Sequence, residues 1–368
     1  MKLHNAPVLL VILDGLADNP DSRGNAVAQA NTPTLDSLRV NAPMTHLTTF
    51  GARVGLPDDQ MGNSEVGHLN IGAGRVVKQE LTLINEAVRE GTLADNAVLR
   101  EVCSSLTDPA ALHLVGLVSD GGVHSSLDHA AALAKEAARL GVRRIYIHAI
   151  TDGRDRPPTA AVDEVNELDD KLKEIQASIP NLELQIVSIC GRYFAMDRDT
   201  RWERTKRAYD LLTQEVAPED ESVRHALEKS YQAGVTDEFV EPVRIASDAV
   251  TRSTRISDGD AILFFNFRAD RMRQIVRAFF SSPDDFSSFE RAAVPRLASI
   301  ASLTEYEEDF PIPVLFRPHT VVNHLGSALS NAGARQLRIA ETEKYPHVAY
   351  FFNGGEEQSV PGEERILI

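Results

Sequence analysis

The sequence predicts an α/β protein with mostly parallel β-sheets, divided into two domains. Short apolar, β-branched runs alternate with helix-like stretches, and the chain has 368 residues, more than one ordinary hydrophobic core accommodates. The runs expected to form strands are VLLVIL (8–13), LHLVGLV (112–118), RRIYIHAI (143–150), LQIVSIC (184–190), AILFFNF (261–267) and HVAYFF (347–352). Near-continuous apolar strands are typical of sheets covered on both faces.

The intervening stretches fix the order of the elements. DHAAALAKEAARLG (128–141) is the clearest helix, with Asp128 expected to cap it and Gly141 to end it. Residues 112–303 show a complete α/β pattern. DFPIPVLFRP (309–318) contains three prolines and is expected to be a linker. The first and last segments of the chain could therefore form one domain, with the middle inserted.

Charge and cysteine content exclude several classes of function. The net charge of −16 argues against nucleic-acid and anionic-membrane partners, although local arginines could still bind a small anion. Cys103 and Cys190 fit neither a metal ribbon nor a disulfide framework, so we expect a reduced, cytoplasmic compartment. The longest apolar run, residues 6–13, is far too short to span a membrane.

Two motifs in the first part of the sequence contain candidate metal-binding or catalytic residues. Asp14 in VILDG follows a predicted strand, where a carboxylate is suited either to a metal or to a turn. Ser64 in GNSEVGH lies near a predicted helix start, as a cap or as a nucleophile for phosphoryl transfer. His68, four residues later, is interpreted as a packing or hydrogen-bonding residue.

Polar loops and arginines follow several of the later strands. SDGGVHS and TDGRDRPP bring His124, Arg154 and Asp155 to one sheet edge, as an anion-binding group or as ordinary polar loops. The remaining candidates are Arg192 and Arg198 after one strand, Arg268 and Arg271 on one helix face after another, and Lys344 ahead of the last strand. The alternatives are ion pairs with the many acidic side chains and, for Lys344, an exposed loop.

Together these motifs resemble the cofactor-independent (2,3-bisphosphoglycerate-independent) phosphoglycerate mutases. The resemblance rests on LDG, NTPTLDSL, MGNSEVGHLNIGAGR, SDGGVHSS, TDGRDRPP, GRYFAMDRD, FNFRADRMRQ and AETEKYPHVAYFFNGG, in the family's order and spacing. It implies that Ser64 is transiently phosphorylated and that Asp155 exchanges protons with the glycerate hydroxyls. Asp14 and Ser64 match ligands of one of two Mn²⁺ ions. The residues that match phosphoglycerate-binding positions are His124, Arg154, Asp155, Arg192, Arg198, Arg268, Arg271 and Lys344.

The resemblance also implies an architecture and a reaction. An alkaline-phosphatase-like domain (1–78 and 313–368) would be interrupted by a substrate-binding transferase domain (79–312). A monomer would interconvert 3-phosphoglycerate and 2-phosphoglycerate in glycolysis and gluconeogenesis. The family's chains continue past EERILI with further metal ligands, so we expect a C-terminally truncated and inactive mutase. The alternatives are a related phosphomutase or phosphatase, such as a phosphopentomutase, and a non-catalytic phosphoglycerate-binding fragment.

Overall fold

The computed structural model describes residues 7–368, apart from 17–18, 59, 215, 247–252 and 318–320. The chain divides into two compact units. Unit 1 combines Met1–Thr82 with His319–Ile368, and unit 2 is Leu83–Pro318. The domain boundaries expected after residues 78 and 312 remain a prediction. Within the described ranges, no helix is both long and apolar enough to cross a membrane.

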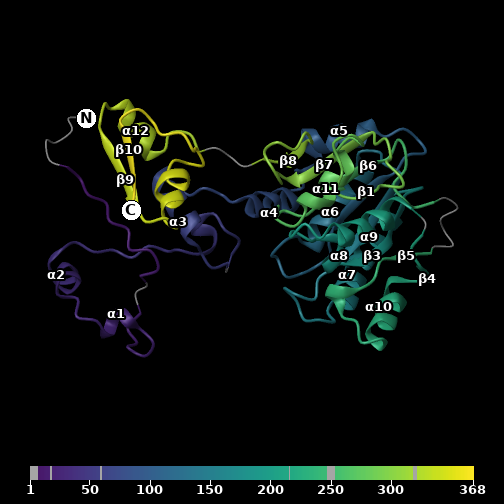
Figure 1. Ribbon diagram of the computed structural model, residues 1–368, viewed down its shortest axis with the longest axis horizontal. Helices are drawn as coiled ribbons and strands as arrows, with labels where there is room; N and C mark the ends of the chain where they lie inside the picture. Colours follow the sequence, from purple (N-terminus) through teal and green to yellow (C-terminus); the bar gives the residue numbers. More distant parts are fainter. Residues whose placement is uncertain (1–6, 17–18, 59, 215, 247–252, 318–320) are drawn as a thin grey trace. The chain divides into compact units, whose positions relative to one another are not determined.

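Unit 2 is built on an eight-stranded sheet with the order β4-β5-β3-β2-β1-β6-β7-β8 (Figure 1). Neighbouring strands are parallel except β3 and β5. The strands are β1 (Leu112–Leu117), β2 (Arg144–Thr151), β3 (Glu183–Gly191), β4 (Glu219–Asp220), β5 (Val243–Ile245), β6 (Ala261–Phe264), β7 (Ser299–Thr304) and β8 (Val314–Phe316). The α/β class with a mostly parallel sheet is confirmed, as are the predicted strands that became β1, β2, β3 and β6.

Helices cover both faces of this sheet because side chains alternate along each strand. Leu112 and Leu114 of β1 join one core with α5, α6 and α7, whereas Val115 and Leu117 join a second core with α9 and α11. The helices are α4 (Glu80–Glu90), α5 (Ala97–Ser105), α6 (Leu127–Arg139), α7 (Ala161–Ser178), α8 (Arg192–Ala195), α9 (Trp202–Thr213), α10 (Val223–Gln232) and α11 (Arg273–Phe280). Short 3₁₀ turns lie at Leu93–Asp95 and Asp237–Phe239.

Two local features of unit 2 differ from the sequence-based expectation. The cap of α6 is Ser126, whose side chain accepts from the Asp128 amide, so Asp128 lies in the first turn, where a carboxylate favours the helix dipole. The proline-rich stretch 309–318 is not a simple linker, because it contains β8, which pairs with β7. Prolines are tolerated next to β8 because it is the last strand of the sheet.

Unit 1 contains short helices and a two-stranded parallel sheet. Its α-helices are α1 (Ala26–Gln29), α2 (Pro33–Asn41), α3 (Ser64–Ala73) and α12 (Leu325–Asn331). A 3₁₀ turn spans Gly51–Val54, a π-helix spans His347–Phe351, and the strands are β9 (Gln336–Ala340) and β10 (Glu363–Leu367). The apolar residues near the end of the sequence belong to β10, which is paired on one side with β9.

The strand predicted at 8–13 does not form. These residues have no strand assignment, and Val8 and Leu9 are 96% and 85% exposed. A strand needs a hydrogen-bonded neighbour, and β9 and β10, the only strands described in unit 1, pair with each other. Asp14 consequently follows an exposed extended segment, and the expected buried strand before it is absent.

The strand predicted at 347–352 is a π-helix instead. Its composition favours a strand, but the Phe352 amide donates to the His347 carbonyl at 3.0 Å, a bond between residues five apart. The preceding turn already has helical bonds from His347 and Val348 to the Lys344 carbonyl. Lys344 therefore begins a helical turn and does not lead into a strand.

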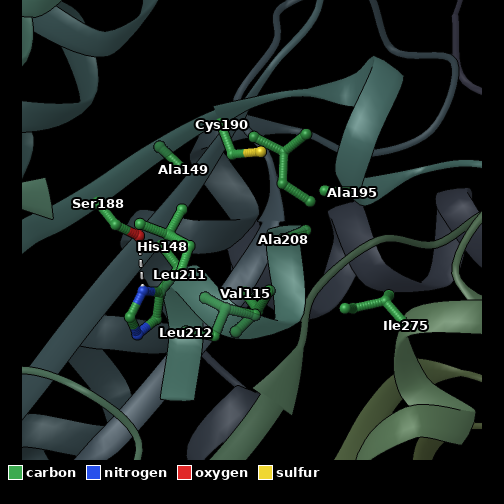
Figure 2. A pocket seen from close by; sticks show the side chains of 11 residues that line it. Val115, His148, Ala149, Ser188, Cys190, Ala195, Ala208, Leu211, Leu212 and Ile275 are labelled. Carbon is green, nitrogen blue, oxygen red and sulfur yellow. Dashed lines mark hydrogen bonds between the residues drawn. The ribbon is translucent and has the colours of Figure 1, made fainter. Parts of the chain in front are cut away.

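A small cavity lies beside His148 in the second core of unit 2 (Figure 2). His148 Nδ1 is 2.7 Å from Ser188 Oγ, and its Nε2 is 2.9 Å from His113 Nδ1. Burial holds the pKa of His148 well below its usual value, so the ring is neutral. With both ring nitrogens partnered and no charged side chain in its lining, this cavity is not a candidate anion site.

Candidate active site

Ser64 is the first residue of α3, but it does not cap the helix. The cap is Asn63, whose side-chain oxygen accepts from the Val66 amide at 2.9 Å. Gly74 ends the helix with a positive φ of 63°, a conformation that glycine adopts without strain. The Ser64 hydroxyl is therefore available for other partners at a helix N-terminus, where backbone amides and the helix dipole favour an anion.

Three polar side chains surround this hydroxyl, and together we call the four residues the serine cluster. Ser64 Oγ donates to Asp14 Oδ2 at 2.5 Å and lies 3.2 Å from Lys344 Nζ. Lys344 also forms an ion pair with the same oxygen of Asp14. His68, 4% exposed, directs Nδ1 at the Ser64 carbonyl oxygen at 2.8 Å and lies 3.3 Å from Oγ.

Electrostatics keep Asp14 ionised. The hydrogen bonds from Lys344 and then Ser64 lower the pKa of Asp14 to about 2. Manganese prefers several oxygen or nitrogen ligands. Asp14 and Ser64 supply oxygens here, but the Lys344 ammonium lies against both, and His68 Nδ1 is directed at the Ser64 carbonyl oxygen. Among the residues that the structure describes, no three His, Cys, Asp or Glu side chains form a metal-holding group. The serine cluster by itself does not fit a metal ion.

A second polar group lies in unit 2, at the carboxyl ends of β1, β2, β3 and β6. The strand order reverses direction between β1 and β6, and such a switch point is where open α/β sheets bind ligands. We call this group the arginine cluster; it comprises His124, Asp152, Arg154, Asp155, Arg192, Arg198, Arg268, Asp270 and Arg271.

Arg192 is the centre of one half of the arginine cluster. Its side chain is 3% exposed, and Nη1 lies 2.6 Å from Asp152 Oδ1 and 2.6 Å from Asp155 Oδ2. Asp152 Oδ1 also accepts from the Arg154 and Asp155 amides, and Ser119 Oγ donates to its Oδ2 at 2.7 Å. Burial acts to raise the pKa of Asp152, but these bonds lower it overall. Asp152 therefore anchors the loop that carries Asp155.

Asp270 is the centre of the other half. Arg198 Nη1 lies 2.7 Å from Asp270 Oδ2, and Arg268 Nε lies 3.1 Å from Oδ1. His124 lies between the two halves, with Nε2 at 3.6 Å from Asp155 and Nδ1 at 3.7 Å from Asp270. Burial and the neighbouring Arg192 charge lower the pKa of His124 to about 4, so the ring is neutral.

Two arginines at the margin of this cluster form weaker or no ion pairs with the described carboxylates. The Arg154 side chain is 53% exposed, with Nη1 at 3.8 Å from Glu238. Arg271 donates to the Met196 carbonyl at 3.2 Å and has no ion pair with any described residue. Burial, followed by the charges of Arg192, Arg198 and Arg154, lowers the pKa of Arg271. A guanidinium in that environment is well placed to bind an anionic ligand.

Comparison with known proteins gives the family. Residues 84–308 match the family model described as the BPG-independent PGAM N-terminus. The 2,3-bisphosphoglycerate-independent phosphoglycerate mutase of Desulforudis audaxviator is 50% identical over 365 residues, covering 99% of this chain and 70% of that protein. This chain belongs to the BPG-independent phosphoglycerate mutase family. These proteins are isomerases by name and reaction class.

Other members and a solved structure agree with that assignment. The mutase of Syntrophotalea carbinolica is 49% identical over 363 residues, covering 98% of this chain and 68% of that protein. A crystal structure of Leishmania mexicana phosphoglycerate mutase, at low cobalt concentration, matches with a TM-score of 0.68 and 32% identity. That match covers 97% of this chain and 66% of the other. The chain thus spans about two thirds of the length of these mutases.

The structure corrects one feature of the mutase motifs and adds two residues. Arg268 and Arg271 do not share a helix face, because α11 begins only at Arg273 and both precede it. Asp152 and Asp270 were not predicted as site residues, although both lie inside the quoted motifs TDGRDRPP and FNFRADRMRQ. The available signal was their position in loops that follow strands, since Asp152 comes directly after β2 and Asp270 lies in the loop after β6. The same signal selected Asp155.

Proposed function

We propose that this chain carries the phosphoryl-accepting and phosphoglycerate-binding residues of a mutase that interconverts 3-phosphoglycerate and 2-phosphoglycerate through phosphoserine at Ser64. We also propose that unit 1 is alkaline-phosphatase-like and is interrupted by unit 2. The two chain segments of unit 1 flank unit 2 in the sequence, which supports this arrangement.

The observation that supports the proposal most strongly is the set of hydrogen-bond partners of the Ser64 hydroxyl. Asn63 supplies the cap, so the hydroxyl is bonded to Asp14 and Lys344 and stays available as a nucleophile. In the proposed first step, Ser64 Oγ attacks phosphorus, its proton moves toward Asp14 Oδ2, and the bond from phosphorus to the C3 oxygen breaks. The amides of the first turn of α3 and the Lys344 ammonium stabilise the transferred phosphoryl group.

The arginine cluster is proposed to hold the glycerate portion. Its five arginines face four carboxylates (Asp152, Asp155, Asp270 and Glu238), which leaves a positive excess in a chain of net charge −16. In the substrate complex Asp155 carries the proton that it gives to the departing C3 oxygen, and it takes one back from the C2 hydroxyl as that oxygen attacks phosphoserine. No net proton is consumed, and the Ser64 oxygen regains its own proton when the second bond breaks.

Two Mn²⁺ ions are expected for the complete reaction, from the family resemblance. When bound, such ions activate the nucleophile and stabilise charge on the phosphoryl group. Asp14 and Ser64 are too few to hold an ion tightly, so no step above is assigned to a metal. We therefore expect little or no turnover from the 368-residue chain in a coupled assay for 2-phosphoglycerate with added Mn²⁺.

Phosphoserine formation and ligand binding test this proposal separately. After incubation with 3-phosphoglycerate and Mn²⁺, mass spectrometry should find a phosphoryl group on the Ser64 peptide and none in Ser64→Ala. Calorimetry should show 3-phosphoglycerate binding that weakens at least about tenfold in Arg271→Gln, since charge-assisted bonds are the strong ones. Arg201→Gln, whose side chain is 48% exposed, is the matched control. Absence of both signals in the wild-type chain would refute the function.

One observation favours a second candidate, a phosphoglycerate-binding protein without turnover. The arginine cluster is assembled, whereas the serine cluster lacks the ligands for a metal. Binding without any phosphorylation of Ser64 would select this candidate. Tighter binding of ribose phosphates than of 3-phosphoglycerate would instead indicate a related phosphomutase.

A further inference from the structure

We propose that Asp270 is a positioning residue that holds His124 in the tautomer with its proton on Nδ1, so that Nε2 faces Asp155 as a hydrogen-bond acceptor. The role of this tautomer in catalysis rests on the proposed function. Its geometry lies entirely within unit 2.

His124 is held between two carboxylates. Nδ1 lies 3.7 Å from Asp270 Oδ1, and Nε2 lies 3.6 Å from Asp155 Oδ2. The side chain is only 4% exposed, and burial keeps the ring neutral by lowering its pKa to about 4. A neutral imidazole has one ring proton and can donate to only one of the two carboxylates.

The pattern of satisfied and unsatisfied atoms selects Asp270 as the acceptor. His124 Nδ1 and Asp270 Oδ1 are both buried and neither forms a hydrogen bond, although Arg268 Nε lies 3.1 Å from Oδ1 in an ion pair. Such groups are costly to leave unpaired, and one Nδ1–H donated to Oδ1 would satisfy both. Asp155 Oδ2, by contrast, already accepts from Arg192 at 2.6 Å.

Asp270 is also held in the ionised form that an acceptor needs. Burial acts to raise the pKa of Asp270, but the bond from Arg198 and the Arg268 charge lower it overall. Arg198 bonds to Oδ2 at 2.7 Å, which leaves Oδ1 directed at the imidazole and Arg268. The two arginines thus keep a negative charge next to Nδ1.

Backbone bonds fix the distance between the two residues. The amides of Phe267 and Arg268 donate to the His124 carbonyl at 2.9 and 3.3 Å. The loop after β6 is therefore attached to the loop after β1 at His124 itself. Asp270, two residues past Arg268, has little freedom to move away from the ring.

For the proposed reaction, this tautomer places a hydrogen-bond acceptor, His124 Nε2, beside Asp155. With Nδ1 protonated, the Nε2 lone pair can accept a hydrogen bond from a glycerate hydroxyl while Asp155 exchanges that group's proton. With the opposite tautomer, Nε2–H would donate to Asp155 and compete with the substrate for its oxygen. Asp270 touches no reacting atom in this scheme and acts through His124.

Nitrogen NMR of the full 368-residue chain without ligand tests the tautomer directly. In a sample labelled with ¹⁵N-histidine, His124→Gln identifies the His124 signals by their loss. We expect Nε2 of wild-type His124 to have the downfield shift of an unprotonated ring nitrogen and Nδ1 to be protonated. In Asp270→Asn the pattern should reverse, because the amide can donate to an unprotonated Nδ1.

Controls separate this role from a structural one. Asp270→Glu retains the carboxylate and should retain the wild-type pattern, and Asp284→Asn, at an exposed position, should do the same. A protonated Nε2 in the wild-type chain overturns the proposal, and this spectrum decides even if Asp270→Asn does not fold. A folded Asp270→Asn with the wild-type pattern also overturns it. Because no substrate is present, failure of 3-phosphoglycerate to bind would refute the proposed function and leave this result intact.

Discussion

The Ser64 hydroxyl lies 2.5 Å from the Asp14 carboxylate, although 50 positions separate the two residues in the chain. The contact is possible because Asn63 caps α3 and leaves the serine side chain to other partners. Capping, which the sequence alone could assign to Ser64, thus belongs to Asn63, and the Ser64 hydroxyl is left to other partners.

This division predicts unequal stability effects for substitutions at Asn63 and Ser64. Asn63→Ala should lower the free energy of unfolding by about 1 kcal/mol, because it removes the acceptor for the Val66 amide. Ser64→Ala should change it by less than about 0.5 kcal/mol, since it removes no cap. Urea denaturation followed by circular dichroism measures both. A larger loss in Ser64→Ala than in Asn63→Ala would contradict the assignment of the cap.

Two glycines within α3 should also respond differently to alanine. A Cβ at Gly72 would lie 2.0 Å from the Phe352 carbonyl oxygen, whereas a Cβ at Gly67 has no heavy atom within 4 Å. Gly67→Ala should stabilise unit 1 by up to about 1 kcal/mol through helix propensity. Gly72→Ala should destabilise it, because the helix and the π-helix end must separate. Thermal unfolding compares the pair, and equal stabilisation of both variants would refute the close packing.

Arg192 should be far more important to stability than an exposed arginine. Arg192→Ala leaves the 1% exposed Asp152 side chain without its ion-pair partner, so a loss of about 3 kcal/mol is expected. Arg201→Ala breaks an exposed pair with Asp199 at 2.9 Å and a longer pair with Asp197 at 3.8 Å, and it should cost less than about 1 kcal/mol. Chemical denaturation of the two variants makes the comparison. Similar losses would show that the Arg192 pair is not effectively buried.

The pH dependence of His124 follows from its lowered pKa. The folded ring should protonate near pH 4, well below the ordinary value of 6.5, because burial disfavours its charged form. Its contribution to stability is therefore complete above pH 6.5 and is lost as pH falls toward 4, since the unfolded chain binds the proton first. The pKa of His225 should be shifted in the opposite direction, above 6.5, because the hydrogen bond with Asp220 favours the charged ring. Titration of the histidine ring protons by NMR measures both, and a His124 midpoint at or above that of His225 would contradict this environment.

The parts of the fold that the sequence predicted are those fixed by local pattern. The apolar runs at 112–118, 143–150, 184–190 and 261–267 became neighbouring parallel strands because each is buried by helices on both faces. The equally apolar run at 8–13 did not, because a strand also depends on a partner that is remote in sequence. Composition likewise favoured a strand at 347–352, where backbone bonds of the preceding turn produced a π-helix.

Prediction of the candidate site was also limited to what the local sequence pattern indicates. Strand ends indicated His124, Asp155, Arg192 and Arg198 correctly as neighbours of one sheet edge, since the carboxyl ends of parallel strands meet there. Asp152 and Asp270 were missed because an aspartate in a turn is common, and only three-dimensional contacts reveal that each organises arginines.

The pairing of β6 with β1 has a consequence for synthesis of the chain. Leu117 at the end of β1 donates its amide to the side chain of Asn266, 149 residues later. The loops that carry His124 and Asp155 are translated long before β6, so they emerge from the ribosome without Arg268, Asp270 and Arg271. Such long-range closure is slow, and until the loop after β6 has been added the cluster lacks Arg268, Asp270 and Arg271, and Arg198 lacks its ion-pair partner Asp270. Under the proposed function, a nascent chain that ends before Arg271 should therefore be unable to retain phosphoglycerate, however well its first three strands have folded.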